Sequence, residues 1–269
     1  MLRERRSLKI LSNYKMFRPR VIPVLLLNHD HLVKSISFRD YQYIGDPLNA
    51  VRIFNELEAD ELTFLDISAT RNNRLISLDL IREIGEESNM PFNVGGGIRQ
   101  IAQIKDVIRA GAEKVIIGSY AASNPDFITK ASNEFGSSTI TVCMDVKKNF
   151  FGKEQVWTIN GTKPSGIDPL EFARLMEKNG AGEIIVQSIS RDGKMNGYDL
   201  SLIKRIATNI NIPTVALGGA GNLEDLKTTY VETHVTGLAA GSIFVYYDRN
   251  KGVLINYPEK KDFNFNDTE

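Results

Sequence analysis

The chain has 269 residues and a mass of 30.1 kDa, with 42% hydrophobic and 25% charged residues. These proportions are typical of a globular protein and exclude wholesale disorder. Its 33 basic and 33 acidic residues cancel, which argues against a generally basic nucleic-acid-binding protein, and no apolar run reaches the roughly 18 residues of a membrane-spanning helix. The single cysteine, Cys143, excludes a disulfide framework, and the three histidines fit no common metal motif, so we expect neither a metal nor a cofactor.

We expect the two ends of the chain to lie outside the folded domain. Residues 1–15 are basic and contain no apolar stretch long enough for a secretory signal peptide. We therefore predict a disordered N-terminal extension and a cytoplasmic protein. The folded domain is predicted over residues 16–258, and a charged, frayed tail over residues 259–269.

Short apolar runs alternate with amphipathic segments through this domain. The runs are apolar on both faces and mostly bounded by Gly or Asp, which is typical of buried parallel strands. We predict strands at residues 21–27, 62–67, 91–94, 114–117, 138–146, 183–188, 212–217 and 235–240. A helical period marks residues 47–57, 101–110, 169–178 and 200–207 between them. Eight strands with intervening helices predict an α/β fold, a closed (β/α)8 TIM barrel.

The second half of the domain repeats the first at a nearly constant distance along the chain. Two dipeptides recur 122 residues later, Asp46-Pro47 as Asp168-Pro169 and Gly96-Gly97 as Gly218-Gly219. The repeat indicates a barrel built from two duplicated half-barrels of four strand–helix units each. A doubly wound open sheet is the alternative fold, but such sheets do not usually repeat in this way.

Glycine-rich turns follow the third and fourth predicted strands of each half. Glycine lets backbone N–H groups approach an anion closely, and the following helix adds a positive dipole end. We therefore predict two phosphate sites on the carboxyl-end face of the barrel and a ligand with a phosphate at each end. The predicted phosphate-binding residues are Gly96, Gly97, Gly118 and Ser119 in the first half, and Gly218, Gly219, Gly241 and Ser242 in the second, where Asp192 and Gly193 form a closing turn. The alternative is that these glycines only form tight turns.

Several stretches within residues 16–244 match a known family. They include Arg20-Val21-Ile22-Pro23, Asp60-Glu61-Leu62-Thr63-Phe64-Leu65-Asp66-Ile67, Val94-Gly95-Gly96-Gly97-Ile98, Gly180-Ala181-Gly182-Glu183-Ile184, Arg191-Asp192-Gly193 and Gly218-Gly219-Ala220-Gly221. With these motifs the chain resembles HisF, the cyclase subunit of imidazole glycerol phosphate synthase. The resemblance implies that ammonia from a HisH-like glutaminase, bound at the N-terminal face, passes through the barrel to a bisphosphorylated ribonucleotide. The products are imidazole glycerol phosphate and an aminoimidazole carboxamide ribotide.

One of two catalytic aspartates of the HisF family is missing. HisF proteins use an aspartate at the end of the first strand and another at the end of the fifth as acid and base. Asp145 stands at the second of these positions, but Leu26 stands at the first. Leucine cannot transfer a proton, and general acid–base catalysis is worth about 10²- to 10⁴-fold in rate, so we expect the cyclase reaction to be impaired. Lys34 matches a lysine of the family's first loop, and a solvated loop charge is its alternative interpretation.

Four charged residues stand just before predicted strands, at the N-terminal mouth of the barrel: Arg20, Glu61, Lys114 and Glu183. Two positive and two negative side chains can close a neutral ring of ion pairs. They match the gate residues at the ammonia entrance of HisF. Partly buried ion pairs add little net stability, so we predict a gate, with a purely structural ring as the alternative.

The C-terminal segment also departs from HisF. Residues 248–258 contain Gly252 and Pro258 and are too short for the expected eighth outer helix. Residues 253–258 resemble the ending of HisF-like paralogues that are encoded with surface-polysaccharide genes. Together with Leu26 and the complete gate, this ending favours a subunit that passes ammonia on for amidation of a sugar. The alternatives are a working cyclase of histidine biosynthesis and a scaffold that binds phosphate but conducts nothing.

Overall fold

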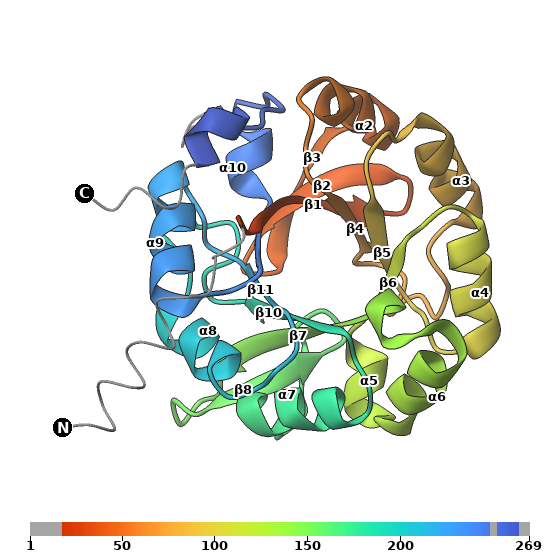
Figure 1. Cartoon of the computed structure of the whole chain (residues 1–269), viewed down its shortest axis with the longest axis vertical. Helices are drawn as coiled ribbons and strands as arrows, with labels where there is room; N and C mark the ends of the chain where they lie inside the picture. The colour runs from red at the N-terminus through yellow and green to blue at the C-terminus, as the bar shows by residue number, and fades with distance from the viewer. Residues whose placement is uncertain (1–17, 248–251, 264–269) are drawn as a thin grey trace, which may run out of the picture.

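The structure is a computed structural model, and it describes residues 18–247 and 252–263. Eight parallel strands form a closed barrel surrounded by helices (Figure 1). In barrel order the strands are β1 (Arg20–Asn28), β4 (Leu62–Asp66), β5 (Phe92–Gly95), β6 (Lys114–Ile117), β7 (Ile140–Lys148), β10 (Glu183–Ser188), β11 (Thr214–Leu217) and β12 (Gly237–Ala240). The last strand, β12, pairs in parallel with β1, which confirms the predicted (β/α)8 barrel.

Helices connect the strands and cover the outside of the barrel. They are α2 (Pro47–Glu56), α3 (Leu78–Glu87), α4 (Ile101–Arg109), α5 (Ser119–Ser123), α6 (Asp126–Phe135), α7 (Pro169–Lys178), α8 (Leu200–Ala207), α9 (Leu223–Thr233) and α10 (Ser242–Val245). No helix in the described ranges has both the length and the apolar character needed to cross a membrane.

The two halves share local structure as well as sequence. Asp46 is the N-cap of α2 and Asp168 is the N-cap of α7; each accepts a hydrogen bond from the first turn, and a proline follows each of them. This combination satisfies free backbone N–H groups and presets the first helical φ angle. An antiparallel hairpin also follows the first strand of each half. These hairpins comprise β2 (His31–Ile36) with β3 (Arg39–Gly45), and β8 (Glu154–Thr158) with β9 (Lys163–Pro164).

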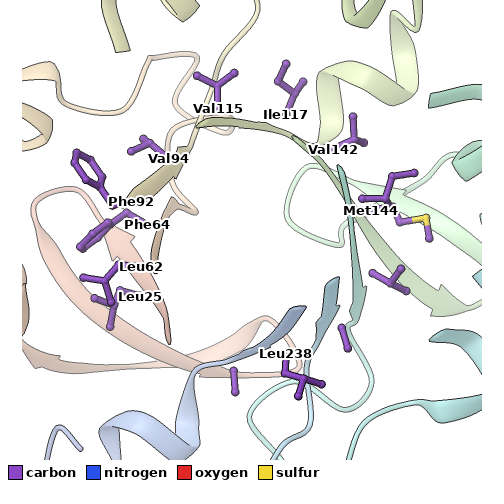
Figure 2. Packing of buried hydrophobic residues seen from close by; sticks show 14 of the residues in the cluster. Leu25, Leu62, Phe64, Phe92, Val94, Val115, Ile117, Val142, Met144 and Leu238 are labelled. Atoms are coloured by element: carbon purple, nitrogen blue, oxygen red, sulfur yellow. The ribbon is translucent and has the colours of Figure 1, made fainter. Parts of the chain in front are cut away.

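Side chains alternate along each strand and divide the core into two parts. The outward-facing set packs between the barrel and the helices, and Figure 2 shows Leu25, Phe64 and Val142 pointing away from the barrel interior. The inward-facing set forms a smaller cluster of Ile22, Val24, Ile116, Ile185, Val215, Leu217 and Ala239. The middle of the barrel is therefore apolar.

Two predictions about the elements need correction, and one feature was not predicted. The run predicted from residue 138 starts with a 3-10 turn (Ser137–Thr139), which follows the left-handed Gly136. The sequence pattern also gave no sign of the two hairpins. The tail predicted from residue 259 is partly folded, because Lys260–Phe263 form a 3-10 turn and Phe263 is buried against Tyr257. The predicted extension over residues 1–15 lies outside the described residues.

Candidate functional site

A cavity of about 590 Å³ opens at the carboxyl ends of the barrel strands. Leu26 of β1 and Asp145 of β7 both line it, together with Leu65 and Gln187. Leu26 also packs against the apolar cluster inside the barrel. The two positions that match the catalytic aspartates of HisF therefore meet in one cavity, where Leu26 presents hydrocarbon and Asp145 presents a carboxyl group.

Asp192, in the loop after β10, brings another carboxyl group to this cavity. Its Oδ2 accepts a hydrogen bond from Ser35 Oγ (2.9 Å), and its Oδ1 accepts one from Gln187 Nε2 (3.2 Å). Gln187 lies beside Asp145 in the sheet. The side chain of Asp192 thus belongs to a hydrogen-bonded network in the cavity wall, and it also lines the second predicted phosphate site. The turn motif could not predict the contact with Ser35, which lies 157 residues away in sequence.

Lys34 lies on β2, where only 5% of the residue is exposed. Its Nζ donates a hydrogen bond to the carbonyl oxygen of Val24 (2.8 Å). Burial lowers the pKa of Lys34 to about 8, although the nearby Asp192 opposes the shift. Burial also raises the pKa of Asp192, against the attraction of Lys34. Lys34 is therefore a residue of the cavity wall, and the solvated loop charge is excluded.

Asp145 has the electrostatic environment of an acid–base group. Burial, and to a smaller extent the charge of Asp192, raises the pKa of Asp145 to about 7. A carboxyl group with such a pKa can both accept and donate a proton near neutral pH. Together with Lys34, it gives the cavity two groups that titrate near neutrality, which is typical of functional sites.

The first predicted phosphate site borders the open part of the same cavity. All four of its residues line the wall: Gly96, Gly97, Gly118 and Ser119. Gly97 has a φ of +70°, and a Cβ at this position would lie 1.8 Å from the carbonyl oxygen of Arg74. The backbone conformation of the turn therefore requires glycine at position 97. The nearest atom to a Cβ on Gly118 is 3.5 Å away, so the turn does not require glycine there.

Arg99 adds a cation beside this first site, and the sequence patterns did not single it out. It lines the cavity two residues after Gly97. Its guanidinium donates to the carbonyl oxygen of Thr70 (3.0 Å) and to the side chain of Asn73. Guanidinium groups bind phosphate oxygens well because their donors lie in one plane. Its position directly behind the glycine turn is the signal that could have revealed it.

The second predicted phosphate site is much more enclosed than the first. Its pocket measures about 20 Å³. The lining residues include Asp192, Gly193, Gly218, Gly219, Gly241 and Ser242. A Cβ on Gly241 would lie 1.9 Å from Lys34 Nζ, so the lysine ammonium group sits directly over this turn. The repeat predicts two equivalent phosphate sites. In the structure they differ, because Lys34 narrows the pocket of the second site.

At the opposite end of the barrel, the four predicted gate residues meet. Arg20 forms ion pairs with Glu61 (2.7 Å) and with Glu183, and Lys114 pairs with Glu183 (3.1 Å). Both glutamates are buried, whereas the side chain of Arg20 is 31% exposed. Among the described residues these ion pairs form an arc and not a full ring. Asn93 of β5 lies between β4 and β6 and donates a hydrogen bond to Glu61.

Buried polar atoms without a protein partner occur along the inside of the barrel. In the described part of the chain they include Asn93 Oδ1, Thr141 Oγ1 and Gln187 Oε1. Asn93 and Thr141 pair in the sheet with the gate residues Lys114 and Glu183, and Gln187 lines the cavity at the other end. An unpaired buried polar atom costs free energy unless a small polar molecule binds to it. These atoms therefore provide hydrogen-bond acceptors at both ends of the apolar interior.

Comparison with known proteins identifies the family of the chain. The model of the family described as histidine biosynthesis protein matches residues 20–250. The chain belongs to this family. It is 45% identical over 248 residues to a Leptospira interrogans protein with the provisional name imidazole glycerol phosphate synthase subunit HisF; the match covers 92% of this chain and 98% of that protein.

Two further relatives carry related names. A Pseudomonas aeruginosa protein, provisionally named subunit hisF2 of the same synthase, is 42% identical over 244 residues, or 91% of this chain and 97% of the relative. The subunit HisF of Alkaliphilus metalliredigens is 39% identical over 231 residues, or 86% of this chain and 92% of the relative. The resemblance to HisF is thus confirmed over most of the chain.

Alanine substitutions test which glycines of the first phosphate site are required by the fold. Gly97→Ala should destabilise the protein by about 2 kcal/mol, because a side chain at this positive φ meets the Arg74 carbonyl group. Gly118→Ala is the matched control and should be close to neutral, since its Cβ has ordinary contacts. Urea unfolding measures both. Equal destabilisation by the two substitutions would contradict this account of the turn.

Asp145→Asn tests the raised pKa of Asp145. An acid whose pKa rises on folding destabilises the protein as pH increases from its unfolded pKa of about 4 to its folded pKa of about 7. The stability of the Asp145→Asn variant relative to the natural chain should therefore increase over this range and then level off. Urea unfolding from about pH 4 to about pH 8 measures the change. A stability difference that is independent of pH would show that the pKa is not raised.

Proposed function

We propose that the chain is a HisF-like subunit that receives ammonia from a HisH-like glutaminase at the N-terminal face of the barrel. Three features along the barrel axis support this proposal: the gate, the apolar interior and the cavity at the carboxyl ends of the strands. Neutral ammonia can cross an apolar interior, whereas a bare ammonium ion would pay a large desolvation cost. The unpaired oxygens of Asn93 and Gln187 offer ammonia hydrogen bonds at its entrance and exit.

We also propose that this ammonia serves the amidation of a sugar in surface-glycan biosynthesis. The observation that carries the proposal is Leu26, which replaces one catalytic carboxyl group while the gate stays complete. A chain that has lost one acid–base group but keeps the gate residues fits a subunit that delivers ammonia to a separate acceptor enzyme. The ending at residues 253–258, with its resemblance to paralogues of this kind, agrees with this role.

The cavity suits a phosphorylated small molecule. Arg99 supplies a cation at the first glycine site, and Lys34 supplies one at the second. Because the second site is narrow, Lys34 must shift before a phosphate group can enter it. The first site is the more accessible of the two for an anionic ligand.

A working cyclase of histidine biosynthesis is the second candidate function. The observation that favours it is Asp192, a half-buried carboxyl group in the same cavity as Asp145. Asp192 could assume one of the two proton-transfer roles that Leu26 cannot fill. Its carboxylate is already held by Ser35 and Gln187, however, which limits its access to a substrate. We therefore favour ammonia delivery.

Titration of the purified chain with its cognate HisH-like glutaminase tests the proposal. We expect a one-to-one complex and faster hydrolysis of glutamine by the glutaminase. Lys114→Met should weaken the complex by roughly tenfold, because it leaves Glu183 with one cation fewer at the docking face. Lys130→Met, on the exposed face of α6, is the control and should leave the affinity unchanged. Absence of a complex with the natural chain would exclude the proposed function.

A further inference from the structure

The end of the chain takes the place of an eighth outer helix. Helix α10 has only four residues, and we call residues 253–263 the C-terminal strap. The strap first runs along the end of α10, where the backbone N–H of Leu254 donates to Val245 and that of Asn256 donates to Phe244 (both 3.0 Å). It closes the helix layer between α9 and α2 (Figure 1).

Tyr257 of the strap is buried beside the first residues of the barrel strands. Its hydroxyl group donates a hydrogen bond to the carbonyl oxygen of Val21 (3.0 Å) and accepts one from the backbone N–H of Asp60 (3.2 Å). Val21 directly follows the gate residue Arg20, and Asp60 directly precedes the gate residue Glu61. One side-chain oxygen thus joins the backbone segments that carry two members of the gate.

A second set of contacts reinforces this junction. The carboxylate of Asp60 accepts a hydrogen bond from the backbone N–H of Val21 (3.0 Å) and forms an ion pair with Arg18. The guanidinium of Arg18 lies over the ring of Phe263, with its central carbon 5.1 Å from the ring centre. Phe263 in turn packs against Tyr257, with 5.5 Å between ring centres. The end of the strap is therefore tied to the gate from two sides.

The Tyr257 ring and its hydroxyl group have separable tasks. The ring packs edge-on against Phe54 and at a tilt against Phe244, which fills the space beneath the missing helix. Phenylalanine would keep both contacts. The hydroxyl group, in contrast, makes the two backbone hydrogen bonds, and these lie next to Arg20 and Glu61.

We propose that Tyr257 is a positioning residue for the gate, and that the C-terminal strap fixes the spacing between Arg20 and Glu61. The inference rests on the proposed function, in which the gate face docks the glutaminase. It goes beyond that function because it assigns a role to the ending of this chain. If the ion pairs of the gate are already held in place, less conformational entropy is lost when a partner docks.

Tyr257→Phe tests the inference, with Tyr198→Phe as the matched control. Tyr198 is also buried and also donates to a strand carbonyl group, that of Ala239 (2.9 Å), but at the last residues of the barrel strands. In the free chain, Tyr257→Phe should accelerate hydrogen exchange of the backbone amides of residues 20–22 and 60–62 by about three- to tenfold. Tyr198→Phe should not. Unchanged exchange at both segments would overturn the inference, whether or not a glutaminase binds.

A double-mutant cycle then tests whether Tyr257 acts through the gate. Binding to the HisH-like glutaminase is measured for Tyr257→Phe, Arg20→Ala and the double variant. We expect Tyr257→Phe to weaken binding about three- to tenfold in the natural chain and to have almost no further effect after Arg20→Ala. Additive losses would show that the strap does not act through Arg20. If the natural chain binds no glutaminase, the proposed function fails, and the exchange result alone decides the structural role of Tyr257.

Discussion

Closure of the barrel is the constraint on which the rest of the structure depends. Once β12 pairs with β1, every second residue of each barrel strand must point inward. The position of an inward-facing residue in its strand then determines how far along the barrel axis its side chain lies. On β1, Arg20 lies at the gate, Ile22 and Val24 belong to the apolar interior, and Leu26 reaches the cavity.

The charged side chains at the two ends of this axis differ in how they are paired. At the gate, acidic and basic side chains neutralise one another in direct ion pairs. In the cavity, Asp145 and Lys34 have no direct ion pair with each other in the described residues, and burial moves the pKa of each toward neutrality. In the proposed function, ammonia would therefore pass from ion-paired side chains at one end to groups able to exchange protons at the other. Leu26 lines the same cavity but cannot exchange a proton. Its identity therefore bears directly on which reaction the cavity can catalyse.

Much of this architecture could be predicted from the sequence. The strand and helix periodicities and the repeat at 122 residues were sufficient for the barrel, because both are properties of local sequence. The meeting of the four charged side chains at one end of the barrel was predictable because these residues stand at strand starts. Asp192 and Asn93 could not be placed in this way. Their roles depend on contacts with Ser35 and Glu61, which come from distant parts of the chain.

The unequal phosphate sites and the strap show a second limit of sequence reasoning. The repeat predicts equal glycine sites, but it carries no information about the hairpin that places Lys34 over Gly241. Likewise, the polar residues 259–269 were predicted to be a tail, whereas in the structure Phe263 packs against Tyr257. In both cases a segment outside the repeated glycine motifs makes contacts that those motifs do not predict.

The most direct test of the account is an assay of the purified chain with the bisphosphorylated ribonucleotide substrate of HisF and ammonium salts, without a glutaminase. The natural chain and Leu26→Asp are compared at the same protein concentration. The account predicts no turnover by the natural chain and a gain of turnover in the variant, because the variant regains the second acid–base group. Efficient turnover by the natural chain would contradict the account and identify the protein as a cyclase that works without that group.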